Sequence, residues 1–130
     1  MIILKVRTNI HTRIVNNKPS IGVHILATGR INANDTDLDL SRTETITVVE
    51  EKYEKELHKA INGVITVSQQ EFKSDIFGFG RQMHIDHPYV WKKIKEQWDE
   101  LYPTLPIEVR TEVRIERIGR TQAPAQLMKY

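Results

Sequence analysis

The sequence contains no cysteine. This excludes disulfide bonds, thiolate metal sites and a cysteine nucleophile, but it leaves the redox compartment open. Aromatic residues are few, with two tryptophans and three phenylalanines among 130 residues. No apolar run approaches the roughly 18 residues of a membrane-spanning helix, and the first residues lack the order of a signal peptide. We therefore expect no part of this sequence to enter a bilayer by itself.

Neither sign of charge dominates the composition. Lysine and arginine number 19 and the acidic residues 17, for a net charge of +2. Such a balance creates no strong field toward nucleic acid or an anionic membrane. Nucleic-acid recognition also needs aromatic side chains among the basic ones, and none of the charged strand positions is aromatic. The length predicts a single domain over residues 1–130, without a nucleic-acid partner.

Three segments, residues 4–14, 21–31 and 107–115, alternate apolar and polar side chains with a period of two. A β-strand with one buried face and one wet face has this period. In the first segment, Leu4 and Val6 are expected on the buried face, with Lys5 and Arg7 on the wet one. Residues 16–20 form a turn cluster, so the first two strands are expected to pair as an antiparallel hairpin.

A helical period begins after Ser41, which with Glu44 forms a capping-box pattern, and continues to Phe72. Gly63 lies inside it, and a glycine there costs about 1 kcal/mol relative to alanine. The long apolar stripe offsets this cost, so we expect one long helix. Its glutamates at 50, 51, 54 and 56 stand among lysines, which is typical of a solvated helix face.

Residues 75–103 contain both tryptophans and two of the three phenylalanines, so we expect the core to form around them. Asp75 is expected to cap a short helix by accepting backbone N–H groups. Gly78 and Gly80 allow a positive φ or a close approach of the backbone to a neighbour. A further helix begins at Asp86 or His87, before Pro88, and presents both tryptophans on one side.

The apolar faces of these predicted strands and helices can be buried only by packing the helices against the sheet. The sequence therefore predicts an α+β fold, with an antiparallel β-sheet and two to three α-helices packed on one face. The element order is β-β-α-α-α-β, and the spatial order of the strands stays open.

Specific residues of this region resemble a known family. The run Asp75-Ile-Phe-Gly-Phe-Gly80, then Pro88, Trp91 and Trp98, and a strand closing in Ile118-Gly119 resemble the C-terminal domain of the Ger(x)C family, the C subunits of spore germinant receptors. The resemblance runs from about residue 21 to residue 119. It implies structural roles for the family motif, which comprises Asp75, Phe77, Gly78, Phe79, Gly80, Pro88, Trp91, Trp98 and Gly119.

The resemblance also implies a function. It implies a non-catalytic domain that acts in spore germination through protein–protein interaction, with integral-membrane A and B subunits as partners. Ger(x)C proteins are larger lipoproteins with a signal peptide and a lipid-modified cysteine, which this sequence lacks. We therefore expect the C-terminal domain of a truncated lipoprotein from the extracytoplasmic face of the spore inner membrane, whose lipid anchor lies outside this chain. The alternative is a domain that binds a small-molecule germinant.

The charged face of the predicted sheet is the candidate interaction surface, and ordinary solvation is the alternative interpretation. The residues proposed for it are Lys5, Arg7, Arg13, Arg110, Glu112 and Arg114. His84, Asp86 and His87 form the only cluster of metal-ligand types, but zinc needs three or four converging ligands, and a helix start also explains them. We predict no catalytic residue, no metal site and no cofactor.

Overall fold

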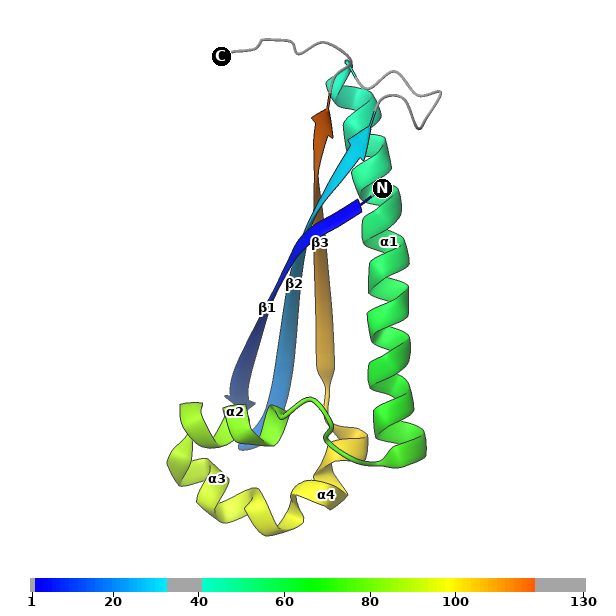
Figure 1. The fold of residues 1–130 in the computed structure, drawn as a ribbon. Coiled ribbons are helices and arrows are strands. Elements are labelled where there is room, and N and C mark those ends of the chain that lie inside the picture. The colour runs from blue at the N-terminus through cyan, green and yellow to red at the C-terminus, as the bar shows by residue number, and fades with distance from the viewer. Residues whose placement is uncertain (1, 33–40, 119–130) are drawn as a thin grey trace. The chain divides into compact units, whose positions relative to one another are not determined.

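The computed structural model of the chain describes residues 2–32 and 41–118, so Gly119 of the motif lies outside the described residues. The α+β prediction is confirmed (Figure 1). The elements are β1 (Ile2–Val15), β2 (Lys18–Asn32), α1 (Thr43–Val67), a π-helical turn (Ser68–Phe72), α2 (Phe79–Asp86), α3 (Pro88–Ile94), α4 (Trp98–Leu101) and β3 (Ile107–Ile118).

The three strands form one sheet in the order β1-β2-β3. β1 and β2 form the predicted antiparallel hairpin, turned by Asn16 and Asn17 at φ values of 53° and 63°. Asparagine tolerates this left-handed region better than most residues, which suits a two-residue hairpin turn. β3 instead runs parallel to β2, so the sheet is mixed and not wholly antiparallel (Figure 1). A long helical connection separates these two strands, as parallel pairing requires.

Contacts group the chain into two compact units. Unit 1 comprises Met1–Arg7, Ile25–Leu57 and Thr111–Tyr130, and unit 2 comprises Thr8–His24 and His58–Arg110. In unit 1, Ile31 and Ile46 form a buried cluster against which Ile115 packs. The buried apolar side chains of unit 2 are Ile21, Val23, Ile65, Phe79, Met83, Trp98, Tyr102, Leu105 and Val109. Each unit therefore has its own apolar centre.

The burial predicted for the start of β1 is wrong. Leu4 is 45% exposed and Val6 58% exposed, although both were expected on a buried face. β1 is an edge strand, with β2 as its one neighbour in the sheet. In unit 1, α1 is bonded to β3 at the opposite edge, which leaves the apolar side chains at the start of β1 partly uncovered.

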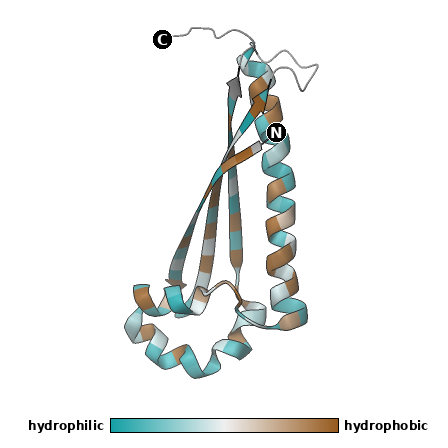
Figure 2. Ribbon diagram, viewed as in Figure 1, coloured by the Kyte–Doolittle hydropathy of each residue, from teal (hydrophilic) through white to brown (hydrophobic). Residues whose placement is uncertain are grey.

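The long helix is confirmed, because α1 runs through Gly63 without a break. Figure 2 shows apolar and polar residues alternating along it, as its sequence period indicates.

The tryptophan helix differs from the prediction. It is divided into α3 and α4 by a 3-10 turn at Lys95–Gln97. Both tryptophans nevertheless lie in unit 2, one on α3 and the other at the start of α4.

Candidate functional site

The carboxylate of Asp75 organises the start of α2. Its Oδ1 accepts the backbone N–H groups of Gly78 and Phe79, both at 3.0 Å, and its Oδ2 accepts the N–H of Gly80 at 2.7 Å. The first N–H groups of a helix have no partner inside the helix, so one carboxylate supplies acceptors for three of these donors. Oδ2 also accepts the indole N–H of Trp98 at 3.0 Å, which ties α2 to α4.

Gly78 and Gly80 serve this loop in different ways. Gly78 has a φ of +80°, a conformation that residues with a Cβ rarely adopt. Gly80 is limited by space, because a Cβ there would lie 2.8 Å from Trp98 Nε1 and 3.0 Å from Trp91 Cη2. The backbone of α2 therefore lies directly against the two indoles.

The aromatic residues of the motif form a connected group in unit 2. The rings of Trp91 and Trp98 meet edge to face with centroids 5.3 Å apart, and His84 stacks on Trp91 at 5.8 Å. Trp98 is 6% exposed and Phe79 only 2% exposed, whereas Phe77 is 37% exposed. Most of this group thus packs inside unit 2, and Phe77 lies at its surface. Pro88 occupies the first turn of α3, where its missing N–H costs nothing.

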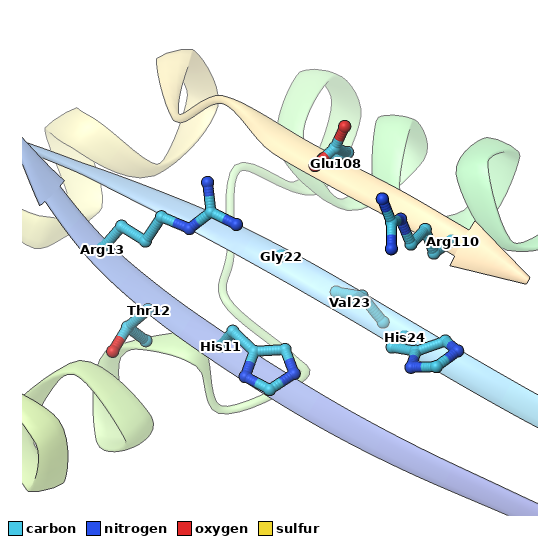
Figure 3. A pocket seen from close by; sticks show the side chains of 8 residues that line it. All are labelled: His11, Thr12, Arg13, Gly22, Val23, His24, Glu108 and Arg110. Carbon is cyan, nitrogen blue, oxygen red and sulfur yellow. The ribbon is translucent and has the colours of Figure 1, made fainter.

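Arg13 and Arg110, two residues of the predicted interaction surface, line one hollow on the sheet of unit 2 (Figure 3). Its volume is about 430 Å³, and its other lining residues are His11, Thr12, Gly22, Val23, His24 and Glu108. The side chains come from three neighbouring strands, with Gly22 on the central strand (Figure 3). Because Gly22 has no side chain, the middle of the hollow stays open. Below we refer to these eight residues as the cationic hollow.

The other residues of the predicted interaction surface belong to unit 1. They are Lys5, Arg7, Glu112 and Arg114. Arg114 donates to Glu112 Oε2 from Nη2 at 2.9 Å and from Nε at 3.2 Å. The structure therefore brings Arg13 and Arg110 together in unit 2, while Glu112 and Arg114 pair with each other in unit 1.

His84, Asp86 and His87 make separate contacts. Asp86 accepts the hydroxyl of Thr12 at 2.5 Å and the amide of Gln82 at 3.0 Å, and His87 Nε2 lies 3.3 Å from the Thr12 carbonyl oxygen. These bonds join α2 and the start of α3 to β1. The carboxylate of Asp86 therefore does not cap α3, contrary to one of our expectations. Within residues 2–32 and 41–118, no three histidine or acidic side chains are placed to hold a metal ion.

The hydrogen bonds of Asp86 also set its acidity. The bond from Thr12, followed by the bond from Gln82, lowers the pKa of the Asp86 carboxyl below its usual value. Hydrogen bonds to a carboxylate favour its charged form, which explains the direction.

A polar contact between the end of α1 and the segment before β3 was missed from the sequence. Ser68 donates its hydroxyl to the carbonyl of Ile65 at 2.8 Å, so in its 2.6 Å contact with Tyr102 the tyrosine must be the donor. Gln69 Nε2 donates to the carbonyls of Tyr102 and Leu105, at 2.8 and 3.0 Å. Burial raises the pKa of the Tyr102 hydroxyl, a direction that favours the protonated form in which it donates. The sequence offered one signal for this contact, namely the two adjacent glutamines that follow Ser68 at the end of the helix.

Two glutamates of α1 were interpreted wrongly as part of a solvated face. Glu54 Oε2 accepts the backbone N–H of Val113 at 2.9 Å, and Glu50 Oε2 accepts that of Ile115 at 2.8 Å. Both N–H donors lie on the edge strand β3 of unit 1, and both acceptors lie on α1. Unpaired N–H groups on an edge strand attract other strands, so these carboxylates protect the edge. Their spacing of four residues places both on one side of α1.

None of the helices within the described residues has the length and apolarity needed to cross a membrane.

Comparison with known proteins gives consistent matches. Residues 1–119 match the protein family described as spore germination B3/GerAC like, C-terminal. Spore germination protein KC of Bacillus subtilis (strain 168) is 32% identical over 118 residues, which cover 90% of this chain and 29% of that protein. Spore germination protein YndF of the same organism is 26% identical over 115 residues, covering 88% of this chain and 28% of that protein.

A solved structure has the same fold. The crystal structure of the GerBC protein matches with a TM-score of 0.76 and 27% sequence identity, covering 87% of this chain and 35% of that chain. The chain thus spans about a third or less of each of these relatives.

Proposed function

This chain belongs to the spore germination B3/GerAC-like C-terminal family, and we propose that it is a non-catalytic interaction and coupling domain of a spore nutrient germinant receptor. In this proposal it is the C-terminal domain of a larger lipoprotein, whose lipid anchor lies outside this chain. It works at the extracytoplasmic face of the spore inner membrane, where integral-membrane A and B subunits are its partners. The names of its relatives, which are spore germination proteins, support this assignment.

The observation that carries the proposal is the cationic hollow. Arg13 and Arg110 are both exposed, and they lie on either side of a glycine in the sheet. A guanidinium group binds a carboxylate through two parallel hydrogen bonds, so a pair of arginines suits an acidic segment of a partner protein. Exposed charges of this kind raise the rate and the specificity of association more than they raise affinity. The motif residues around Asp75, in the same unit, would serve to hold the hollow in shape.

The proposal is tested by co-purifying the full-length lipoprotein with the membrane subunits. The variant carries Arg13→Glu together with Arg110→Glu, and the control carries Arg81→Glu, because Arg81 is exposed in the same unit but does not line the hollow. We expect the double variant to lose recovery of the membrane subunits and the control to keep it. Normal recovery and normal germination with the double variant would show that the hollow is not the contact surface.

Deletion of the whole domain tests the coupling role separately. We expect a receptor without these residues to respond poorly to nutrients even where its subunits still assemble. A receptor that assembles and responds normally after the deletion would disprove coupling.

A further inference from the structure

Unit 1 contains a second hollow of a different character. It has a volume of about 400 Å³ and lies at the lower end of the range of about 300–1,000 Å³ found for ligand sites. Its lining residues are Ile3, Val6, Ala27, Tyr53, Glu56, Leu57 and Val113, all of unit 1. They come from all three strands and from α1. We call this site the apolar hollow.

The sequence of β2 explains why space exists there. Every second residue along β2 is buried, and the larger buried residues include Ile25 and Ile31. Between these two, the alternation places Ala27 and Gly29, which are both buried and both small. Ala27 is 3% exposed and Val113 4% exposed, so they form the deep part of the hollow. A larger side chain at position 27 would occupy the space that is now empty.

The side of the hollow formed by β1 is accessible. Ile3 is 52% exposed and Val6 58% exposed, so apolar surface at this end of the hollow faces solvent. A ligand with a hydrocarbon body would remove this surface from water, at a gain of roughly 25 cal/mol per Å².

Among the described residues that line the apolar hollow, Glu56 is the only charged one. It is exposed, and no cation pairs with it among the residues that the structure describes. Apart from the hydroxyl of Tyr53, the polar group that these lining residues present is the carboxylate of Glu56, and such a pocket complements a molecule that is apolar except for one cationic group. We propose that the apolar hollow binds a small organic monocation, with a branched or cyclic hydrocarbon body and a primary ammonium group that meets Glu56. This site goes beyond the proposed interaction function and does not depend on it.

The test uses three probes with one carbon skeleton and different charges. Isopentylamine is the cation, isopentanol the neutral analogue and isovalerate the anion. Each is titrated into the full chain, and binding is followed by the amide NMR signals of Ala27, Tyr53 and Val113. We expect saturable shifts at these residues, with the amine binding about threefold more tightly than the alcohol, as an exposed ion pair allows. We expect the anion to bind most weakly.

Two variants separate the hydrocarbon contact from the charge contact. Ala27→Leu fills the hollow and should abolish the shifts for all three probes. Glu56→Gln should remove the preference for the amine while the alcohol still binds. Glu51→Gln is the matched control, because Glu51 is exposed on the same helix but does not line the hollow. If Ala27→Leu does not fold, Val6→Trp at the exposed rim replaces it.

The proposal is overturned if no probe shifts these signals, or if isovalerate binds as tightly as isopentylamine. It is also overturned if Glu56→Gln leaves the order of the probes unchanged. Failure of the receptor co-purification experiment would not affect these results, because that experiment changes only residues of unit 2.

Discussion

Trp98 donates its indole N–H to Asp75 Oδ2 at 3.0 Å, on the same oxygen that accepts the backbone N–H of Gly80. One carboxylate thus connects the start of α2 to a tryptophan that is 23 residues further along the chain. This contact explains why an aspartate, two glycines and a tryptophan occur together in the motif. All four residues take part in the contact between the backbone at the start of α2 and the indole of Trp98.

Replacement of Asp75 by alanine should destabilise unit 2. The change removes the acceptor of three backbone N–H groups and one indole N–H, and we expect a loss of about 2–4 kcal/mol in the free energy of unfolding. Asp75→Asn should lose less, because its amide oxygen can still accept. Denaturant unfolding followed by tryptophan fluorescence measures the change. Asp99→Ala is the control, because Asp99 is exposed, and equal stability of the two alanine variants would contradict this account.

Two glycines of unit 2 should respond to alanine in opposite directions. At Gly80 a Cβ would lie 2.8 Å from Trp98 Nε1, so Gly80→Ala should cost about 1–3 kcal/mol. At Gly63, inside α1, a Cβ would meet nothing within 4 Å, so Gly63→Ala should stabilise the protein by about 0.5–1 kcal/mol. Thermal melts of the two variants, compared with that of the parent protein, show whether each substitution raises or lowers stability. If Gly80→Ala also stabilised the protein, the close approach of helix and indoles would be refuted.

Replacement of Glu54 by alanine should expose the edge of β3. The change removes the acceptor of the Val113 N–H, and we expect a loss of about 1–3 kcal/mol. The bond from the Thr111 hydroxyl should survive, because it goes to the backbone carbonyl of Glu54. Hydrogen exchange of the Val113 amide should therefore become faster. Glu51→Ala, on the exposed side of the same helix, should leave that rate unchanged.

Local patterns in the sequence were sufficient for most of the elements and for part of the motif, although they did not show the 3-10 turn that divides the tryptophan helix. Asp75 bonds to residues three to five positions away, a distance at which the capping preference of aspartate already predicts the contact. The single long helix α1 followed in the same way, because its apolar stripe continues on both sides of Gly63.

Contacts between distant parts of the chain were not predictable in this way. Glu54 and Val113 are 59 residues apart, and a glutamate among lysines has the same pattern whether it faces solvent or the edge of a strand. The parallel pairing of β3 with β2 was missed for a similar reason, since an alternating strand does not show which neighbour it pairs with or in which direction. The small residues Ala27 and Gly29 fit the strand period, and only the folded structure shows the space beside Ala27.

Thr12 should control the acid response of Asp86. Its hydroxyl bond is the main cause of the lowered pKa of the Asp86 carboxyl. A lowered pKa in the folded state stabilises the protein above the ordinary aspartate value, and this contribution is lost as the pH falls through the lowered pKa. Thr12→Val removes the hydroxyl while the shape of the side chain is kept. We therefore expect the pKa of Asp86 to rise toward its usual value, so that this contribution to stability becomes smaller and is lost over a narrower pH range just below that value.

An NMR titration of the Asp86 side-chain carboxyl measures this change directly. Thr66→Val is the matched control, because the Thr66 hydroxyl donates to the carbonyl of Asn62 and does not bond to Asp86. The bond between His87 and the Thr12 carbonyl should persist in Thr12→Val, because it involves only the backbone of Thr12. If Thr12→Val and Thr66→Val left the Asp86 titration equally unchanged, the link between β1 and α2 would not set the acidity of this carboxyl. Gln82→Ala should then be the variant that raises the pKa, because Gln82 supplies the second hydrogen bond.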